Sequence, residues 1–482
     1  MQSEKRQTTA SSIAVIGGGI AGATAAVHFA ELGLNVTLIE KKSSLVSGPP
    51  ICHLHAGGNL YREISTEQCL ELLKQSIDTA RLYPHTVNNR PTIIAVPYLD
   101  GGTPEELYER LIAIQSAYKE LVEQDPANKV LGEPEDYYRF YSKDEIEALK
   151  DKVQPEQPKS FDDWLIPFAK HTNLETLRFP IAVVQEPGWS VFRIGASAAL
   201  ALEQMPNCNL LLNTQLTDLV EQEGGWKLTC VNQQGESVEV NADYLVNACG
   251  YETGNIDDLA EKPRSRLVEF KAAYVTKWTE YSELWPEVIF HGPRGTPNGM
   301  AQLTPYANGV FQLHGMTKDI TLFDDGLVAS SQHSSQPKLP VKLEGKITSG
   351  WDHQVAVERS RRAIEHMARF VPDYQHAVEY GTPLFGAQQI PGSDETLRAA
   401  DVTFEGEHYA RIEVVKGSSA LEAAMKIVTQ WHLYQYRHES IESLHPVSMS
   451  LSEQSIEEKA TEMAVERSYP PELAQYYGEV HQ

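Results

Sequence analysis

The chain has few cysteines and no long apolar run, and these absences exclude several classes of protein. Its five cysteines are scattered, and no two of them form a CxxC pair. We therefore expect neither a disulfide framework nor a zinc site, and we predict a reducing, cytoplasmic location. No run of about eighteen apolar residues occurs, so the sequence predicts no transmembrane helix.

Basic residues are scarce relative to acidic ones. The 482 residues include 41 Lys and Arg against 66 Asp and Glu, and the formal charge is -25. Nucleic acid and anionic lipid both require a basic surface, so neither is expected as the main partner. The apolar content of 41% and the charged content of 22% are typical of a soluble globular protein. At this length we expect two structural domains.

The most informative segment lies near the start of the chain. The apolar run at 13–16 predicts a buried strand, which leads into Gly17-x-Gly19-x-x-Gly22 and a helix of small residues at 21–32. Because the glycine turn interrupts the apolar segment, we assign it to the fold rather than to a secretion signal.

A second strand follows at 35–39 and ends at the acidic Glu40, beside Lys41. Strand, glycines, helix, strand and acid in this order make up a dinucleotide-binding fingerprint. Glu40 is placed to accept hydrogen bonds from an adenosine ribose.

The glycine turn has a physical task at each position. Gly17 permits the tight turn, and Gly19 lets backbone N–H groups approach a pyrophosphate. Gly22 lets the helix pack closely on the strand. The first helical turn, which includes Ile20 and Ala21, offers its partial positive charge to the phosphates.

Hydrophobic periodicity predicts the later elements. Helices are expected at 66–81, 104–123, 143–149, 194–204, 352–370 and 420–437. Strands are expected at 92–97, 181–185, 210–212, 270–278, 288–291, 300–304 and 310–314, with a strand-turn-strand unit at 403–415. The segments 226–231, 237–240 and 244–246 indicate a meander. Nucleotide-type units thus occur at the start, middle and end of the chain, so a second domain must be inserted in two pieces.

Several later motifs accompany the opening one. They are Pro187-Gly188-Trp189-Ser190-Val191-Phe192-Arg193-Ile194, Asn247-Ala248-Cys249-Gly250, Leu303-Thr304-Pro305-Tyr306, Gly386-Ala387-Gln388-Gln389-Ile390-Pro391-Gly392 and Val415-Lys416-Gly417-Ser418-Ser419. Together they resemble the D-amino-acid oxidase superfamily of FAD-dependent oxidoreductases, in particular its glycine- and sarcosine-oxidase-like members. The fourth motif has glutamine where the family commonly has arginine.

The resemblance implies an α/β fold with a Rossmann-like FAD-binding domain built from discontinuous segments and a mainly antiparallel α+β substrate domain. It assigns 11–90, 175–262 and 378–440 to the first domain, 91–174 and 263–377 to the second, and 441–482 to a polar tail. It also implies that FAD contacts Ala248, Gly250, Gly386, Gly417, Ser418, Ser419 and Ala420. Lys416 would lie near the flavin ring, where it assists oxygen or orients the substrate; an ordinary surface lysine is the alternative.

The loop at 51–61 is a second candidate for flavin contact. The resemblance implies cofactor contacts for His53, His55, Ala56, Gly57, Gly58, Asn59 and Leu60. His55-Ala56-Gly57-Gly58 is similar to the His-Ala-Ala-Gly segment of the dimethylglycine dehydrogenase branch, whose histidine bonds covalently to FAD. The preceding Ser-Thr-Trp is absent here, and His53 intervenes. A covalent bond through His55 therefore stands as a hypothesis beside a non-covalent contact and a structural histidine.

Substrate groups are sought on the strands of the second domain. Arg264 and Arg266 precede its sheet, and an arginine fork matches a carboxylate. Tyr274 and His314 lie on strands with apolar neighbours, and His314 is a candidate base. Each of these residues has a purely structural alternative. The acids after Gly250, Asp257 among them, are expected to be solvated at a helix start.

The sequence leaves three functions open. The first is hydride transfer from a C–N bond of an amino acid or secondary amine to flavin N5, with O2 or a quinone as electron acceptor. The second is a 2-hydroxy-acid dehydrogenase that passes electrons to quinone, like malate:quinone oxidoreductase. The third is a non-catalytic flavoprotein with a role in assembly or modification.

Overall fold

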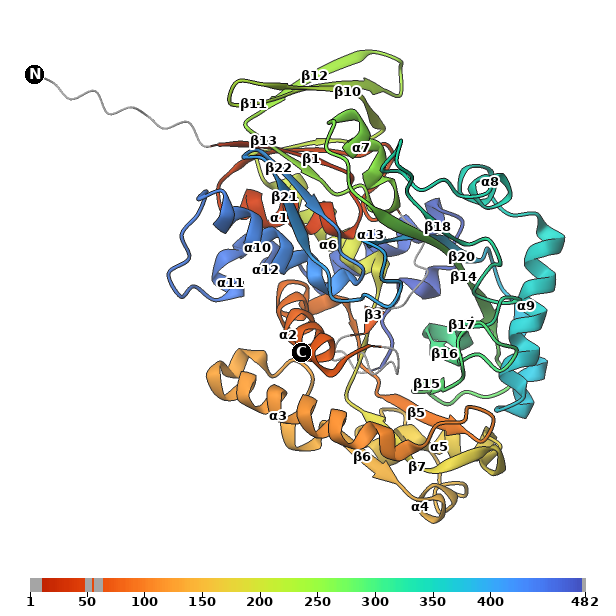
Figure 1. Ribbon diagram of the computed structural model, residues 1–482. Helices are drawn as coiled ribbons and strands as arrows, with labels where there is room; N and C mark the ends of the chain where they lie inside the picture. Colours follow the sequence, from red (N-terminus) through yellow and green to blue (C-terminus); the bar gives the residue numbers. More distant parts are fainter. Residues whose placement is uncertain (1–10, 48–53, 56–63, 479–482) are drawn as a thin grey trace, which may run out of the picture.

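A parallel sheet and a larger mixed sheet organise the fold (Figure 1). The computed structural model describes residues 11–47, 54–55 and 64–478. Across these residues the strands form one six-stranded sheet, one ten-stranded sheet and two three-stranded sheets. Helices pack on both large sheets, and the predicted α/β class is confirmed.

The six-stranded sheet has the order β21-β22-β13-β1-β2-β9. Its members are β1 (Ser12–Ile16), β2 (Asn35–Ile39), β9 (Cys208–Leu211), β13 (Tyr244–Asn247), β21 (Val402–Glu405) and β22 (Tyr409–Ile412). All neighbouring strands are parallel except β21, which pairs antiparallel with β22 at one edge. The central strand β1 is apolar and buried from Ile13 to Ile16 because both faces of the sheet are covered.

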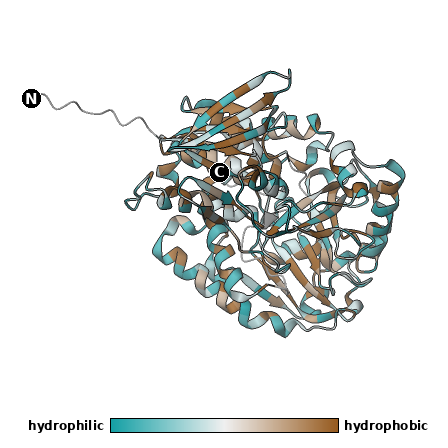
Figure 2. Cartoon of the chain, turned by 45° about the horizontal axis from the view of Figure 1, so that its top comes forward, coloured by the Kyte–Doolittle hydropathy of each residue, from teal (hydrophilic) through white to brown (hydrophobic). Residues whose placement is uncertain are grey.

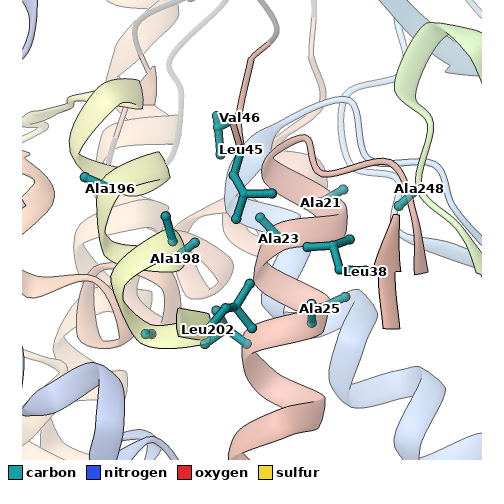
Figure 3. Close-up of a cluster of buried hydrophobic side chains, with 14 of the residues drawn as sticks. Ala21, Ala23, Ala25, Leu38, Leu45, Val46, Ala196, Ala198, Leu202 and Ala248 are labelled. Carbon is teal, nitrogen blue, oxygen red and sulfur yellow. The ribbon is translucent and has the colours of Figure 1, made fainter. Parts of the chain in front are cut away.

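Helices cover one face of this sheet and a small sheet covers the other. The helices are α1 (Ile20–Glu31), α6 (Val191–Gln204), α10 (Ala420–Gln430) and α13 (Glu453–Glu466), and the small sheet is β10 (Thr214–Gln222), β11 (Gly225–Asn232) and β12 (Ser237–Ala242). Figure 3 shows Ala23 of α1 on the side of that helix that faces Ala198 and Leu202 of α6. Small side chains let these two helices approach closely.

The predicted meander is wrong in its third strand. The segment at 244–246 lies in β13, which pairs with β1, and the small sheet instead takes β10 as its third strand. β13 is apolar and buried, as a central parallel strand requires.

The end of the chain also differs from the prediction. The helix predicted at 420–437 stops at Gln430, and His432 adopts a positive φ of 55° soon after it. The segment expected as a polar tail contains α11 (Ile441–Leu444), α12 (Pro446–Met449) and α13. Apolar side chains at helical spacing, including Ile456, Ala460 and Met463, bury α13 against α6.

The ten-stranded sheet follows the path β18-β14-β17-β16-β15-β5-β7-β6, and β19 and β20 also pair with β14. Its members are β5 (Thr92–Pro97), β6 (Tyr138–Tyr141), β7 (Leu177–Val184), β14 (Arg266–Lys277), β15 (Glu287–Phe290), β16 (Ala301–Pro305), β17 (Val310–Gly315), β18 (Leu327–Ala329), β19 (Val378–Glu379) and β20 (Leu384–Pro391). The predicted domain boundaries place β7 and β20 in the other domain, yet both pair with strands of this sheet.

One face of this sheet is covered along its length, and the other only in part. The helices α5 (Phe161–His171) and α9 (His353–Ala368) pack on the first face. On the second face, α2 (Thr66–Leu82) and α3 (Tyr108–Gln124) cover β5 and β7. The remaining helices are α4 (Lys143–Glu147), α7 (Thr253–Leu259) and α8 (Val341–Ser349), and β3 (Leu54–His55), β4 (Val87–Asn88) and β8 (Gly188–Trp189) form the last small sheet.

Figure 2 shows hydrophobic residues concentrated on the strands and hydrophilic residues on the outer turns of the helices. No helix in the described part of the chain is long and apolar enough to cross a bilayer.

Candidate functional site

The carboxyl ends of four parallel strands meet at one edge of the six-stranded sheet. β1 runs into Gly17, β2 into Glu40 and β13 into Ala248, and Lys416 follows β22 by four residues. Ligands of open α/β sheets bind at this edge. Predicted cofactor residues from the start, middle and end of the sequence therefore lie together.

The glycine turn is shaped by close backbone contacts on one side and open space on the other. Gly17 has a φ of +96°, and a Cβ at Gly22 would lie 1.8 Å from the carbonyl oxygen of Gly17. At Gly19, the N-cap of α1, no described atom lies within 4 Å of the place a Cβ would occupy. No described side chain caps this helix end. The first-turn N–H groups therefore remain available for an anion.

Glu40 presents a nearly buried carboxylate beside the turn. It accepts the N–H of Gly18 at 2.6 Å and the N–H of Lys42 at 2.7 Å. Burial has the larger effect and raises the pKa of Glu40, and these two hydrogen bonds offset that rise only in part. A carboxylate has about four acceptor positions, so two remain for ribose hydroxyls. Lys41 forms an ion pair with Glu252 instead.

A short loop after β2 seals the glycine turn. The N–H of Val46 donates to the carbonyl oxygen of Gly18 at 2.7 Å, and Leu45 packs against Gly18. Figure 3 shows Leu45 and Val46 above α1 and α6. Arg467 donates to the carbonyl oxygens of Leu45 and Val46 at 2.6 and 2.8 Å, and to Oγ of Ser44 at 2.8 Å. No local pattern in the sequence predicts this contact.

The turn η9 (Gly417–Ser419) sits at the start of α10, whose first residue is Ala420. Oγ of Ser419 donates to Oε1 of Gln75 at 2.6 Å, and Oγ1 of Thr79 donates to the carbonyl oxygen of Ser418 at 2.9 Å. Helix α2 thus holds η9 in place, and no described side chain caps its N–H groups. Those N–H groups can donate hydrogen bonds to the ring of a bound cofactor.

These features fit FAD. The open side of Gly19 and the uncapped start of α1 suit a pyrophosphate, and the free acceptor positions of Glu40 suit a ribose. Ala248 packs close to Gly17, and Gly250 has a φ of +58° just beyond it. The residues that would hold FAD are therefore those of the glycine turn, Glu40, the end of β13 and η9.

The ten-stranded sheet turns a polar face toward this edge. The register of β14, β16, β17 and β20 places Glu269, Lys271, Gln302, Thr304, Gln312, His314 and Gln388 on one face. All of them except Gln388 are buried. The opposite face carries Phe270, Leu303 and Leu313 and packs under α9. Buried polar groups that lie on the face of a sheet opposite its apolar core are typical of a binding site.

A cavity of about 180 Å³ lies over this polar face. Lys271, Arg294, His314, Arg398 and Lys416 are among the residues that line it. The structure thus brings together two of the predicted catalytic residues, His314 and Lys416. A larger hollow of about 490 Å³ lies between α2, β21 and α10, apart from these residues.

Lys271 is tied to both halves of the site. Its Nζ lies 2.8 Å from Oε2 of Glu269 and donates to Oε1 of Gln388 at 3.1 Å. Nε2 of Gln388 donates to the carbonyl oxygen of Val415 at 2.6 Å, next to Lys416. Arg294 pairs with the same Glu269, and the two cations help to lower the pKa of that carboxyl. Gly386 lies opposite Lys271 on β20.

Tyr274 does not reach the cavity. Strand alternation turns it to the opposite face from Lys271, into the core under α9. Its hydroxyl donates to the carbonyl oxygen of Ile320 at 2.9 Å and accepts from Nε of Arg359 at 2.7 Å. The prediction of a catalytic role for Tyr274 is therefore withdrawn.

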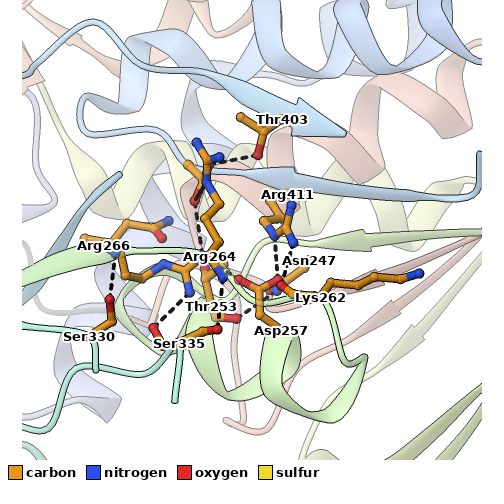
Figure 4. A network of polar contacts seen from close by, with 12 residues as sticks. Asn247, Thr253, Asp257, Lys262, Arg264, Arg266, Ser330, Ser335, Thr403 and Arg411 are labelled. Atoms are coloured by element: carbon orange, nitrogen blue, oxygen red, sulfur yellow. Dashed lines mark hydrogen bonds and ion pairs between the residues drawn. The ribbon is translucent and has the colours of Figure 1, made fainter. Parts of the chain in front are cut away.

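Arg266 is also elsewhere, in a buried network between the two large sheets (Figure 4). Its Nη2 lies 2.5 Å from Asp257 and 3.1 Å from Glu413, and Arg264 pairs with Glu413 as well. Nε of Arg411 donates to Asp257 at 2.6 Å. The expectation of a solvated Asp257 was wrong, and Arg266 is satisfied by protein carboxylates rather than by a substrate.

The structure describes only residues 54–55 of the loop at 51–61, which carries His53 and His55. His53, Ala56, Gly57, Gly58, Asn59 and Leu60 lie outside the described residues. His55 is described only as backbone of β3, where it pairs with Gly188 of β8. The covalent bond to His55 stays a prediction.

Sequence reasoning missed Lys271, Arg294 and Gln302. One signal was present: Glu269 and Lys271 alternate with the apolar Val268, Phe270 and Ala272. That period of two predicts one polar face on a buried strand. Arg294 lies in a loop whose sequence carried no signal.

Residues 12–391 match the model of a family described as FAD dependent oxidoreductase. No curated protein matches the chain. Among solved structures, glycine oxidase from Geobacillus kaustophilus aligns with a TM-score of 0.54 and 14% identity over 92% of this chain and 99% of its own.

Two further structures are similar in fold. L-amino acid deaminase from Proteus vulgaris has a TM-score of 0.56 and 12% identity, covering 90% of this chain and 97% of its own. Glycerol-3-phosphate dehydrogenase from Bacillus halodurans, complexed with FAD, has a TM-score of 0.53 and 13% identity, covering 95% and 73%. With a family match across most of its length and a cofactor edge that fits FAD, the chain belongs to the FAD-dependent oxidoreductase family and is an FAD-dependent oxidase or dehydrogenase.

Proposed function

We propose that this enzyme oxidises the C–N bond of a small amino acid or N-substituted amino acid bound in the cavity over the polar face. The observation that carries the proposal is the cationic, hydrogen-bonding lining of that cavity beside Lys416. An amino acid offers a carboxylate for the cations and an amine for the neutral polar groups. Solved structures of similar fold named as glycine oxidase and L-amino acid deaminase support this choice.

The residues divide into binding and proton-transfer roles. Arg294 and Lys271 pair with the substrate carboxylate, because a guanidinium fork and an ammonium are the groups that bind carboxylates best. Gln302 and Gln388 orient the amine through their amide oxygens. His314 accepts a proton from the substrate ammonium.

The reaction balances with these roles. The ammonium loses one proton to a ring nitrogen of His314, and the Cα–H bond then breaks as the C=N bond forms. FAD, when bound, supplies the acceptor for the hydride that leaves Cα. The product is an iminium ion, which water hydrolyses after release.

Anaerobic mixing tests the proposal. The purified holoenzyme is mixed without oxygen with amino acids, N-methyl amino acids and 2-hydroxy acids, and the flavin absorbance at about 450 nm is followed. Bleaching by an amino acid is the expected result. Bleaching by 2-hydroxy acids alone would favour the hydroxy-acid dehydrogenase, and bleaching by none of these compounds would contradict the proposed substrate class.

The proposed electron acceptor is O2 or a quinone, and a covalent bond between His55 and FAD remains a hypothesis. Readmission of air, or of a quinone, after bleaching identifies which of the two reoxidises the enzyme. Acid precipitation tests the bond to His55, because only a covalent flavin stays yellow in the washed pellet. We propose a cytoplasmic location because the cysteines are scattered along the sequence and no two of them form a CxxC pair.

A further inference from the structure

The C-terminal segment at 441–478, here called the strap, crosses from the six-stranded sheet to the ten-stranded one. The family match ends at residue 391, so the strap lies outside it. Glu31 of α1 accepts the N–H of Ser448 at 2.8 Å. At the far end, Glu472 pairs with Lys277 of β14, and the hydroxyl of Tyr477 donates to the carbonyl oxygen of Trp285.

Arg467, directly after α13, is where the strap meets the cofactor edge. Its guanidinium donates to two carbonyl oxygens and one hydroxyl of residues 44–46, and it lies over the ring of Phe192 at 5.6 Å. Among the described residues, loop 44–46 is also held by the hydrogen bond from the N–H of Val46 to the carbonyl oxygen of Gly18. The planar fork of arginine can hold several acceptors at once, which a lysine cannot do.

A glycine on α6 allows this contact. A Cβ at Gly195 would lie 3.1 Å from Cε of Met463, 3.2 Å from Cβ of Val46 and 3.4 Å from the carbonyl oxygen of Leu45. The strap and loop 44–46 therefore meet over the same point of α6. The loop in turn touches Gly18 through Val46 and Leu45.

We infer that Arg467 is a positioning residue for FAD binding. Its hydrogen bonds to described residues go to loop 44–46 and not to the glycine turn or Glu40, although the charge of Glu40 acts on it. It fixes loop 44–46 against the glycine turn, and the N–H of Gly18 in that turn is bound by Glu40. Without it, the loop loses four hydrogen bonds from one charged donor to three acceptors, and the turn and Glu40 lose their support.

Three full-length variants test the inference. Arg467→Ala removes the contact, Arg467→Lys keeps the charge but not the fork, and Ile456→Ala destabilises α13 far from the loop, since Ile456 is buried against the core. Each protein is stripped of FAD and titrated with FAD by flavin fluorescence. The melting temperature of each apoprotein is measured in parallel.

The expected result separates positioning from stability. Arg467→Ala should weaken FAD binding about tenfold or more, and Arg467→Lys should fall between it and the natural protein. Ile456→Ala should lower the melting temperature at least as far yet keep its affinity for FAD within about twofold. If Arg467→Ala does not fold, the same comparison is made between Arg467→Lys and Ile456→Ala.

Two results would overturn the inference. One is an unchanged FAD affinity in both Arg467 variants. The other is a loss of affinity in all variants in proportion to their loss of melting temperature, which is what a purely structural strap would give. Neither depends on which substrate the enzyme oxidises.

Discussion

Replacement of Gly19 by alanine should separate cofactor binding from folding. Gly19 is the N-cap of α1 with a φ of -65°, which alanine adopts without strain. No described atom lies within 4 Å of the place its Cβ would take. The folded apoprotein should therefore tolerate the methyl group, and we expect a stability change of less than about 0.5 kcal/mol.

FAD should not tolerate it. The open side of Gly19 is where backbone N–H groups approach the pyrophosphate, and a methyl group there holds the phosphates away. A loss of about 2 to 3 kcal/mol in binding corresponds to a 30- to 150-fold weaker affinity. FAD titration by fluorescence measures the affinity, and thermal unfolding of the apoprotein measures the stability.

The control is Gly345→Ala in α8, where a Cβ also meets no described atom. It should leave FAD affinity unchanged and slightly raise stability, because alanine is the better helix residue. The reasoning is refuted if Gly19→Ala binds FAD as tightly as the natural protein does.

Four other predictions follow from single contacts. Gly22→Ala should destabilise even the apoprotein by about 1 to 3 kcal/mol in urea unfolding, since its Cβ would lie 1.8 Å from a carbonyl oxygen; a wild-type midpoint would contradict the close packing of α1 on β1. Tyr274→Phe should cost about 1 to 2 kcal/mol of stability and leave kcat and KM unchanged, and a raised KM would return Tyr274 to the substrate site. Arg294→Gln should raise the KM for an amino acid about tenfold, whereas Arg361→Gln on the exposed side of α9 should not; equal KM values would exclude Arg294 as the carboxylate partner. The free energy of unfolding should fall as the pH drops below about 6.5, because burial lowers the pKa of His28 and His445 and the unfolded chain therefore binds protons at a higher pH than the folded one. Its slope against pH approaches about 1.4 kcal/mol per pH unit for each histidine. An unfolding midpoint that does not change with pH would contradict this prediction.

The histidine prediction rests on a chain of matched hydrogen bonds. Nδ1 of His445 lies 2.6 Å from the carbonyl oxygen of Ile441, Nδ1 of His28 lies 2.9 Å from Nε2 of His445, and the hydroxyl of Tyr436 lies 2.7 Å from Nε2 of His28. Two neutral rings satisfy every one of these contacts. A proton added at Nε2 of His445 would face the Nδ1–H of His28, and a proton added at Nε2 of His28 would require the Tyr436 hydroxyl to accept instead of donate. The nearby carboxylates Glu31 and Glu442 act on His445 in the opposite sense.

Local patterns in the sequence were enough to predict several strands and the glycine turn. The strands Asn35–Ile39 and Thr92–Pro97 were predicted with the bounds that the structure has. The glycine turn, the acid at Glu40 and the small residues after β13 are each encoded within a few neighbouring positions. They converge because parallel strands bring their carboxyl ends to one edge, which the motif order already implies.

Long-range contacts explain what the sequence did not reveal. Arg467 reads as one more charged residue at the end of a polar helix, and its partner Val46 lies 421 residues away. Arg266 looked like a substrate ligand because its acids, Asp257 and Glu413, are brought to it only by the fold. Which strand β13 would pair with was likewise a choice between partners that no local pattern distinguishes.

A crystal structure of the protein with FAD bound tests the account most directly. It predicts the pyrophosphate against the first turn of α1, a ribose hydroxyl within hydrogen-bond distance of Glu40, and the flavin ring between Lys416 and the face that carries Lys271 and His314. A ring bound away from that face, or a ribose that Glu40 does not touch, would contradict it.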